Sequence, residues 1–255
     1  MSDIQAKFPS LMGQTVVVTG GASGIGEAFV RAFFAQGSRV TFLDIDAKAG
    51  SELASELNAA GDARALFLNC DVTDIPALRS CIRRSGEELG AATILINNAA
   101  NDKREEFEEV TVEDFDWMMN VNVRHHLFAI QEVLPQMRKA GWGSIINMSS
   151  PTWVGGGPDM PNYSMAKAAV VGLTNSMANR LGGDSIRVNA ILPGSVITER
   201  QLRLWHSQES FDEAVKRQAI HEQLLPKHVA DLALFLAADE SRLISKQMFF
   251  INGGS

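Results

Sequence analysis

A tyrosine and a lysine four residues apart, Tyr163 and Lys167, form the pair of side chains in this sequence best suited to acid–base chemistry. The stretch that follows, 166–181, lacks proline and has apolar residues at helical spacing, so it predicts a helix over 163–181. On a helix the two side chains project from one face, about one turn apart. A tyrosine hydroxyl has a pKa of about 10, and a neighbouring ammonium favours the phenolate. The same spacing is common on solvated helices, so the pair alone does not establish an active site.

The composition of the 255 residues excludes several classes of protein. A net charge of −7 provides no broad basic field, so no nucleic-acid partner is expected. Two cysteines, Cys70 and Cys81, are too few for a disulfide framework or a four-ligand zinc site, so we expect reduced thiols and no metal. The sequence has no apolar run long enough to span a membrane and no apolar core of a secretory signal near Met1. We therefore expect a soluble, cytoplasmic protein with no membrane partner.

Short β-rich runs alternate with longer helical patterns along nearly the whole chain. The expected strands are 15–19, 39–43, 65–68, 93–96, 144–147, 186–191 and 247–251, and the expected helices lie near 24–36, 46–60, 74–89, 112–139, 163–181 and 227–238. The strand runs are continuously apolar, as in strands that are covered on both faces. This alternation predicts a single α/β domain, 1–255, with a doubly wound parallel sheet of about seven strands and helices on both faces. Residues 195–222 break the rhythm and are expected to form a helical insertion.

A glycine-rich turn, Thr19-Gly20-Gly-Ala-Ser-Gly24-Ile-Gly26, follows the first expected strand and opens the first expected helix. Glycines at these positions permit a tight turn, let backbone amides approach a pyrophosphate, and allow the helix to pack closely on the sheet. The helix N-terminus adds amide donors and the positive end of its dipole. Together with an acidic residue at the end of the next strand, the turn predicts a Rossmann-type dinucleotide site.

That acidic residue is Asp44, which can accept hydrogen bonds from the ribose hydroxyls of the adenosine half and would repel a 2′-phosphate. Neither Ser23 nor Ile45 is basic, so the sequence favours NAD over NADP. Asp44 could instead be a solvated turn residue. Asp71, after the third strand, is a candidate for the adenine edge or simply a residue that shapes a turn.

Further motifs follow the glycine turn in a fixed order. They are Asn97-Asn98-Ala99-Ala100 after the fourth strand, Ser149-Ser150 thirteen residues before Tyr163, Pro193-Gly194 after the sixth strand, and Asn252-Gly253-Gly254 near the end. With these motifs the chain resembles the short-chain dehydrogenase/reductase family over nearly its full length. Two positions depart from the family pattern. Ala100 replaces a glycine beside the cofactor, and Lys246 stands where glycine is usual before the last strand, so we expect an altered backbone or a strained turn there.

The resemblance implies a catalytic group of Asn122, Ser150, Tyr163 and Lys167. In this group the serine bonds the substrate oxygen and the tyrosine exchanges the proton. The lysine lowers the pKa of the tyrosine and bonds the nicotinamide ribose, and the asparagine holds a water that connects the lysine to solvent. Two alternatives stay open: Ser149 could be the serine that points into the site, and Asn122 could bond a backbone carbonyl inside its helix.

The resemblance also implies a set of residues that binds the cofactor, NAD. Its members lie in the glycine turn, at the strand ends and on the helix of the tyrosine: Gly20, Ser23, Gly24, Ile25, Gly26, Asp44, Asp71, Val72, Asn98, Tyr163, Lys167, Pro193, Gly194, Val196, Ile197 and Thr198. Ile197 and Thr198 are expected at the nicotinamide carboxamide, although Thr198 could instead cap the helix that follows.

Segments 101–104, 123–126, 150–153 and 198–201, followed by Trp205, resemble the branch of the family that oxidises aldoses at the anomeric carbon. Polar side chains suit sugar hydroxyls, and an aromatic ring suits the flat face of a sugar. The expected substrate contacts are Asn101, Ser150, Trp153, Tyr163 and Arg200, and residues 195–222 are expected to close over the substrate. The tryptophans could instead be core or subunit-contact residues.

Three functional hypotheses follow from these residues. The favoured one is an NAD-dependent oxidoreductase that transfers hydride from C1 of an aldose, such as galactose, arabinose or xylose, to NAD and gives the lactone. The second is an NAD(P)-dependent reductase or dehydrogenase of another secondary alcohol or carbonyl, including 3-oxoacyl thioesters. The third, a nucleotide-binding regulatory or structural protein without catalysis, is disfavoured by the four catalytic positions. The family implies a homotetramer.

Overall fold

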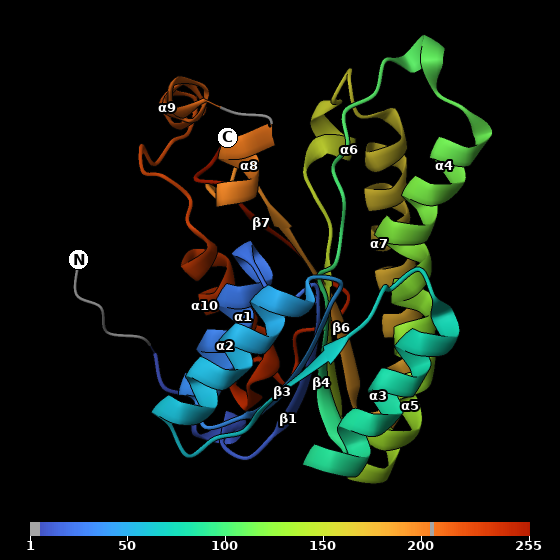
Figure 1. The fold of residues 1–255 in the computed structure, drawn as a ribbon, viewed down its shortest axis with the longest axis vertical. Helices are drawn as coiled ribbons and strands as arrows, with labels where there is room; N and C mark the ends of the chain where they lie inside the picture. The colour runs from blue at the N-terminus through green and yellow to red at the C-terminus, as the bar shows by residue number, and fades with distance from the viewer. Residues whose placement is uncertain (1–5, 205–206) are drawn as a thin grey trace.

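The computed structural model describes residues 6–204 and 207–255 (Figure 1). Within them, seven strands form one parallel sheet in the order β3-β2-β1-β4-β5-β6-β7. The strands are β1 (Thr15–Thr19), β2 (Arg39–Asp44), β3 (Ala65–Asn69), β4 (Ala92–Asn97), β5 (Gly143–Met148), β6 (Ile186–Pro193) and β7 (Met248–Ile251). The strand order reverses between β1 and β4, which opens a crevice at the carboxyl ends of these strands. The expected doubly wound α/β sheet is confirmed.

Helices cover both faces of the sheet (Figure 1). One layer contains α1 (Gly24–Ala35), α2 (Ala47–Ala60) and α10 (Pro226–Ala237), and the other contains α3 (Ile75–Leu89), α5 (His125–Ala140) and α7 (Pro161–Leu181). Shorter elements connect them: η1 (Pro9–Leu11), η2 (Phe107–Glu109), α6 (Thr152–Gly155), η4 (Gly182–Asp184) and η5 (Asp239–Ser241). The sheet is therefore the central layer of three.

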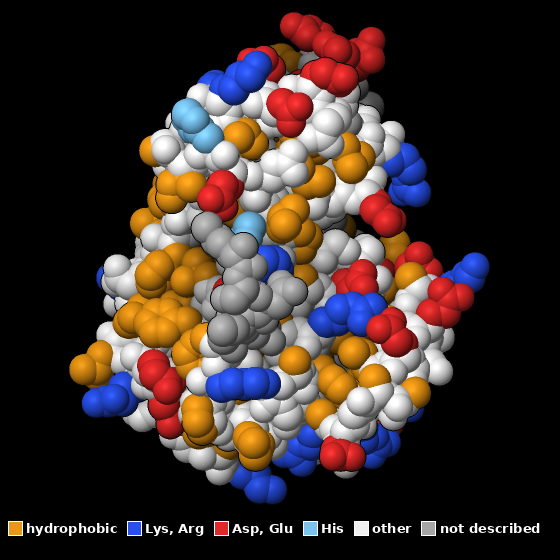
Figure 2. Space-filling model, turned by 90° about the vertical axis from the view of Figure 1, so that its left-hand side faces the viewer, with side chains coloured by type: hydrophobic (Ala, Val, Ile, Leu, Met, Phe, Trp, Pro, Cys, Tyr) orange, Lys and Arg blue, Asp and Glu red, His pale blue; other side chains and the backbone are white. Residues whose placement is uncertain are grey.

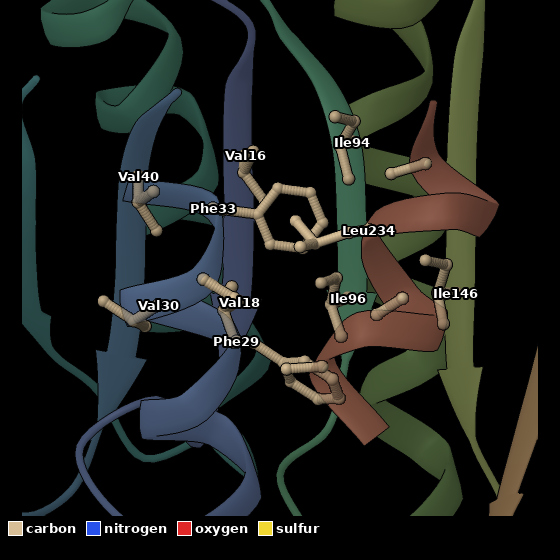
Figure 3. Close-up of a cluster of buried hydrophobic side chains, with 14 of the residues drawn as sticks. Val16, Val18, Phe29, Val30, Phe33, Val40, Ile94, Ile96, Ile146 and Leu234 are labelled. Carbon is tan, nitrogen blue, oxygen red and sulfur yellow. The ribbon is translucent and has the colours of Figure 1, made fainter. Parts of the chain in front are cut away.

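Figure 3 shows how the first helix layer is attached to the sheet. Phe29 and Phe33 of α1 and Leu234 of α10 lie over β1 and β4, and none of the three is exposed. Burying one such side chain contributes about 1.5–3 kcal/mol. The residues of β1, β4, β5 and β6 are all buried, which agrees with the continuously apolar pattern of these strands. The packing holds the start of α1 against the end of β1, where the glycine turn lies.

The helix expected over 112–139 is interrupted. The structure has α4 (Val112–Met119), a π-helical segment η3 (Asn120–Arg124) and then α5. Asn122 is fully buried in the π-helical segment. Its Nδ2 donates to the carbonyl oxygens of Met118 (3.0 Å) and Asn101 (2.9 Å), and its Oδ1 accepts from the amide of Asn101 (2.9 Å). A widened turn places this side chain against the loop after β4, because a π-helical turn rearranges the local hydrogen bonds.

Residues 195–222 contain α8 (Glu199–Leu204) and α9 (Gln208–Lys216), which lie beyond the carboxyl ends of the strands (Figure 1). Trp205 lies outside the described residues. Among the described residues, no helix has the length and apolarity that crossing a membrane requires. On the face shown in Figure 2, acidic and basic side chains are interspersed, and the described residues of that face form no basic field.

The two departures from the family pattern differ in their backbone. Ala100 is not among the residues with positive φ, so the alanine is accommodated there without left-handed strain. Lys246 has φ of 64°, and its amide donates to the carbonyl oxygen of Val188 (2.8 Å). The strained turn expected before β7 is therefore present at Lys246.

Replacing Lys246 with glycine should stabilise the protein, because a left-handed backbone costs an L-residue about 1–2 kcal/mol and costs glycine little. We expect the free energy of unfolding to rise by about 1 kcal/mol, which corresponds to an increase in Tm of roughly 2–4 °C in a chain of this size. Lys246→Ala is the control, since it removes the exposed side chain and keeps the strain. Equal stability of the two variants in denaturant titration would contradict the expectation.

Candidate active site

A cavity of about 1450 Å³ lies along the carboxyl ends of the strands. This volume exceeds that of a typical small-molecule pocket, so it has room for a dinucleotide and a second small molecule. Every residue expected to bind the cofactor lines it: Gly20, Ser23, Gly24, Ile25, Gly26, Asp44, Asp71, Val72, Asn98, Tyr163, Lys167, Pro193, Gly194, Val196, Ile197 and Thr198. The fold thus gathers one set of side chains from segments almost 180 residues apart in sequence.

The glycine turn is shaped for a group that approaches the backbone closely. Gly20 has φ of 66° and Gly24 has φ of 57°, both in the left-handed region that favours glycine. A Cβ atom built on Gly26 would lie 1.7 Å from the carbonyl oxygen of Gly20, so α1 can approach the turn only if this residue has no side chain. The free amides at the start of α1 then face the cavity, as a pyrophosphate requires. These residues fit the phosphate groups of a nicotinamide cofactor.

The carboxylate of Asp44 is held in place at the end of β2. Its Oδ2 accepts from the amide of Ala22 (2.9 Å), and its Oδ1 accepts from the amide of Asp46 (3.0 Å). Within 20–27 and 44–49, the segments around it, no lysine or arginine lines the cavity. This wall is therefore acidic, which suits ribose hydroxyls better than a 2′-phosphate.

Asp71 and Thr198 each make the structural contact that the sequence left open as an alternative to cofactor binding. The Oδ1 atom of Asp71 accepts from the amide (2.8 Å) and hydroxyl (2.7 Å) of Thr73, so this carboxylate shapes a turn while it lines the cavity. The hydroxyl of Thr198 accepts from the amide of Gln201 (3.2 Å) in the first turn of α8. Both residues have a structural contact in addition to their place in the wall.

The tyrosine and the lysine lie on α7, with the Nζ atom of Lys167 5.6 Å from the centre of the Tyr163 ring. Tyr163 is half-buried and makes a hydrogen bond with the side chain of Ser150. The hydroxyl of Ser149, by contrast, donates to the carbonyl oxygen of Lys167 (2.8 Å). Because that hydroxyl already holds α7, Ser150 is the serine that meets the tyrosine.

Burial determines the acid–base properties of this pair. Lys167 is only 1% exposed, and its Nζ donates to the carbonyl oxygen of Met148 (2.9 Å). Burial lowers the pKa of Lys167 to about 7. Burial also raises the pKa of Tyr163 above its usual value; the negative charge of Asp102 adds to this rise, and the hydrogen bond from Ser150 opposes it. The expectation that the lysine brings the tyrosine's pKa toward neutrality is therefore not met here, because desolvation of the buried hydroxyl is the largest influence on that pKa.

Asn122 does not appear among the described residues that line the cavity. Its hydrogen bond to the carbonyl oxygen of Met118 matches the alternative in which it bonds a backbone carbonyl inside its helix, and it also bonds the amide and the carbonyl oxygen of Asn101 outside the helix. By holding both backbone groups of Asn101, it fixes the loop that follows β4 at the edge of the cavity. Its role in holding a water stays a prediction.

The structure brings four of the five expected substrate contacts to the cavity: Asn101, Ser150, Tyr163 and Arg200. It does not bring Trp153 there, since this residue is absent from the described lining. The indole Nε1 of Trp153 is buried and has no hydrogen-bond partner among the described residues. The alternative of a packing role for this tryptophan therefore fits the structure better.

Two residues that the sequence analysis did not assign also line the substrate end, Asp102 and Gln201. Asp102 accepts hydrogen bonds from Arg200 Nη2 (3.3 Å) and from Gln201 Nε2 (2.6 Å). The available signal was a run of five charged residues, 102–106, one residue after the Asn97–Ala100 motif. Their partners are distant in sequence, so the run alone did not reveal them.

The geometry can be compared with known proteins. A family model described as enoyl-(acyl carrier protein) reductase matches residues 20–255. A protein of Rhizobium meliloti named "probable galactose dehydrogenase" is 43% identical over 249 residues, which cover 98% of this chain and 97% of the relative. This chain belongs to the short-chain dehydrogenase/reductase family.

Other members of the short-chain dehydrogenase/reductase family support this assignment. A D-xylose 1-dehydrogenase of Caulobacter vibrioides is 39% identical and covers 98% of both chains. A crystal structure of a 3-oxoacyl-[acyl-carrier protein] reductase from Brucella melitensis superposes with a TM-score of 0.91 at 30% identity, covering 100% of this chain and 97% of that one. This short-chain dehydrogenase/reductase is an oxidoreductase that uses a nicotinamide cofactor, NAD or NADP, and it resembles the sugar 1-dehydrogenase branch.

Proposed function

We propose that this enzyme is an NAD-dependent aldose 1-dehydrogenase, which transfers hydride from C1 of an aldose such as galactose, arabinose or xylose to NAD and releases the lactone. The observation that carries the proposal is the placement of Ser150, Tyr163 and Lys167 together in the wall of the cavity. The names of the relatives that are 43% and 39% identical support an aldose as the substrate class.

Each residue of the group has one task in this proposal. Ser150 bonds the oxygen on C1 of the sugar and holds it against the hydroxyl of Tyr163. Tyr163 takes the proton from that oxygen, and Lys167 bonds the nicotinamide ribose. Asn122 holds the loop of Asn101 at the substrate end. It also holds a water that connects the lysine to solvent. Bound nicotinamide supplies the hydride acceptor, so the protein contributes orientation and proton transfer.

A panel of substrates tests the proposed function. The purified protein is mixed with aldoses, polyols and secondary alcohols, each with NAD and with NADP, and absorbance of the reduced cofactor is followed. We expect galactose, arabinose or xylose to reduce NAD. Activity on simple alcohols without a response to any pyranose would overturn the sugar assignment.

The preference for NAD has its own test at Asp44, whose carboxylate lines an acidic wall. Asp44→Asn keeps the size of the side chain and removes the charge that favours ribose hydroxyls and repels a 2′-phosphate. We expect the ratio of kcat/KM with NAD to that with NADP to fall by about 10- to 100-fold, the value of a hydrogen bond to a charged group. Asp74→Asn is the matched control, since Asp74 caps α3, is not among the described lining residues and should leave the ratio unchanged. If Asp44→Asn left the ratio of kcat/KM with NAD to that with NADP unchanged, the charge of Asp44 would not set the cofactor preference.

A reductase of another carbonyl, including 3-oxoacyl thioesters, is the second candidate. The structural similarity to a 3-oxoacyl-[acyl-carrier protein] reductase favours it. Oxidation of NADPH or NADH with a 3-oxoacyl thioester, at a rate above that of NAD reduction by any aldose, would make it the better assignment. Reduction of NAD by any substrate would exclude the third hypothesis, a nucleotide-binding regulatory or structural protein without catalysis.

The proposal also includes the domain organisation, a lid and the assembly of the enzyme in the cell. The chain forms one catalytic domain, residues 195–222 act as a lid over the substrate, and four copies assemble in the cytoplasm. Sedimentation of the purified protein tests the tetramer, and fractionation of the producing cell tests the location.

A further inference from the structure

Four consecutive charged residues after β4 each contact a different part of the molecule. Asp102 accepts from α8, and Lys103 Nζ donates to Asp114 of α4 (2.7 Å). Arg104 pairs with Asp159, just before α7 (3.0 Å), and Glu105 accepts from Nδ2 of Asn162 on α7 (2.9 Å). The link from Asp102 joins the loop to α8. All three of its residues, Asp102, Arg200 and Gln201, line the cavity, whereas in the pair of Arg104 and Asp159 only the arginine is among the described lining residues.

The side chains of α8 divide into an inner and an outer group. Arg200 and Gln201 are half-buried and reach Asp102, whereas Leu202, Arg203 and Leu204 are exposed. Asp102 thus holds the inner group of α8 across the cavity from the loop after β4. Its two carboxylate oxygens are divided between the two partners, with Oδ1 toward the guanidinium and Oδ2 toward the amide.

The charge of Arg200 is compensated by this contact. The guanidinium and the carboxylate are 3.3 Å apart; the side chain of Asp102 is 15% exposed and that of Arg200 is 41% exposed, so water screens the pair from the arginine's side only. The other arginine near the loop, Arg104, also lines the cavity and pairs with Asp159. Glu199 and Arg203 of α8 also line the cavity, but both are exposed, so solvent screens them. At the substrate end, Asp102 is therefore the acidic group with the least solvent around it.

Asp102 also lies close to the reacting centre, since its negative charge raises the pKa of both Tyr163 and Lys167. A substrate held by Ser150 and Tyr163 is consequently within reach of its field. A neutral sugar can offer hydroxyl donors to this carboxylate. A sugar that carries its own carboxylate would place a second negative charge beside Asp102, whose side chain is 15% exposed, and would find Arg200 already paired.

We infer that Asp102 is a specificity-determining residue, which by engaging Arg200 makes the enzyme select neutral aldoses and reject the corresponding hexuronates. The inference rests on the proposed function, because it concerns the substrate class of the same site. Removing the carboxylate leaves Arg200 without its counter-charge and able to bind the carboxylate of a uronic acid. The chain thus holds a latent uronate-binding group that a single acid keeps neutralised.

The test compares galactose with galacturonate, which differ at C6 alone, using kcat/KM with NAD. In Asp102→Asn, the amide oxygen can still accept from Gln201, but the charge opposite Arg200 is gone. We expect the ratio of galacturonate to galactose to rise by about 10- to 100-fold over that of the wild type, the range for a charge-assisted hydrogen bond. The double variant Asp102→Asn/Arg200→Gln should lose this gain. Asp114→Asn is the matched control: it cuts the neighbouring link to Lys103, outside the cavity, and should leave the ratio unchanged.

Each outcome has a defined meaning. A rise in the ratio that depends on Arg200 supports the inference. A parallel loss of activity on both sugars in Asp102→Asn, with the ratio unchanged, would show that the residue only anchors α8 and would overturn the inference while the proposed function stands. A gain that persists without Arg200 would also overturn it. A wild type that oxidises no aldose at all would overturn the proposed function and this inference together.

Discussion

The variant Tyr163→Phe is expected to bind NAD as the wild type does and to turn over about 10²–10⁴ times more slowly, the usual loss when a positioned acid–base group is removed. Phenylalanine keeps the ring that packs on α7 near Lys167, so the cofactor wall stays intact. Only the hydroxyl that bonds Ser150 is lost. Turnover is measured with the best aldose, and cofactor affinity by fluorescence titration with NADH.

The residue that follows Tyr163 on α7 offers a matched control for this variant. Ser164, directly after Tyr163, has a buried hydroxyl with no hydrogen-bond partner among the described residues. Ser164→Ala removes a hydroxyl from the same turn of α7 and should leave turnover unchanged. Turnover of Tyr163→Phe like that of the wild type would remove the tyrosine from proton transfer.

The ionisation of Tyr163 can be observed directly as a function of pH, because it is the only tyrosine in the sequence. Burial raises its pKa, so phenolate absorbance in the ultraviolet should appear only above the ordinary value of about 10. In the proposed sugar oxidation the phenolate is the base, so the rate of that reaction should increase with pH. A phenolate signal that appears well below pH 10 in the protein alone would contradict the effect of burial.

The second large effect is expected at the glycine turn. In Gly26→Ala, the new Cβ would lie 1.7 Å from the carbonyl oxygen and 2.7 Å from the carbonyl carbon of Gly20, and 2.8 Å from Nδ2 of Asn98. Two of these atoms are backbone, and the amide of Asn98 already donates to Gly20 (2.9 Å). The start of α1 must therefore move away from the turn. We expect cofactor binding to fall below detection and the free energy of unfolding to fall by about 3 kcal/mol or more.

Gly172→Ala is the control for this substitution. Gly172 lies inside α7, and a Cβ there would meet nothing within 4 Å, so alanine should raise the free energy of unfolding by about 0.5–1 kcal/mol. Denaturant titration and NADH binding of both variants separate the two effects. Cofactor affinity of Gly26→Ala equal to that of the wild type would show that the close approach is not needed.

The elements of the fold could be predicted almost completely from local patterns. The strand expected at 15–19 has the observed bounds, and those expected at 39–43 and 65–68 each end one residue short of the observed end. β1 is buried throughout and β2 over four of its six residues, and continuous apolar runs bounded by glycine or polar residues indicate that burial directly. The helix over 112–139 could not be predicted in detail. Its π-helical segment depends on the contact between Asn122 and the loop of Asn101, which lie 21 residues apart.

The cofactor wall could also be predicted, because carboxyl ends of parallel strands meet at one edge of a sheet. Motifs at the ends of β1, β2, β3, β4 and β6 therefore lie together once the strand order is known. The substrate end was predicted less well. Trp153 was assigned to it and does not line it, whereas Asp102 lines it and was not assigned. Neither outcome is encoded in spacing, since both depend on how the loops beyond the strands pack.

By itself, the sequence determined the parallel α/β sheet, the glycine turn and the positions of Ser150, Tyr163 and Lys167, because each follows from local periodicity or from motifs placed at strand ends. The tertiary structure alone decided which serine meets the tyrosine, how burial shifts the pKa values of the tyrosine and the lysine, and which acid faces Arg200. The physical reason is that desolvation and ion pairing depend on the distance between groups in space. Asp102 and Arg200 are 98 residues apart in the chain and 3.3 Å apart in the fold.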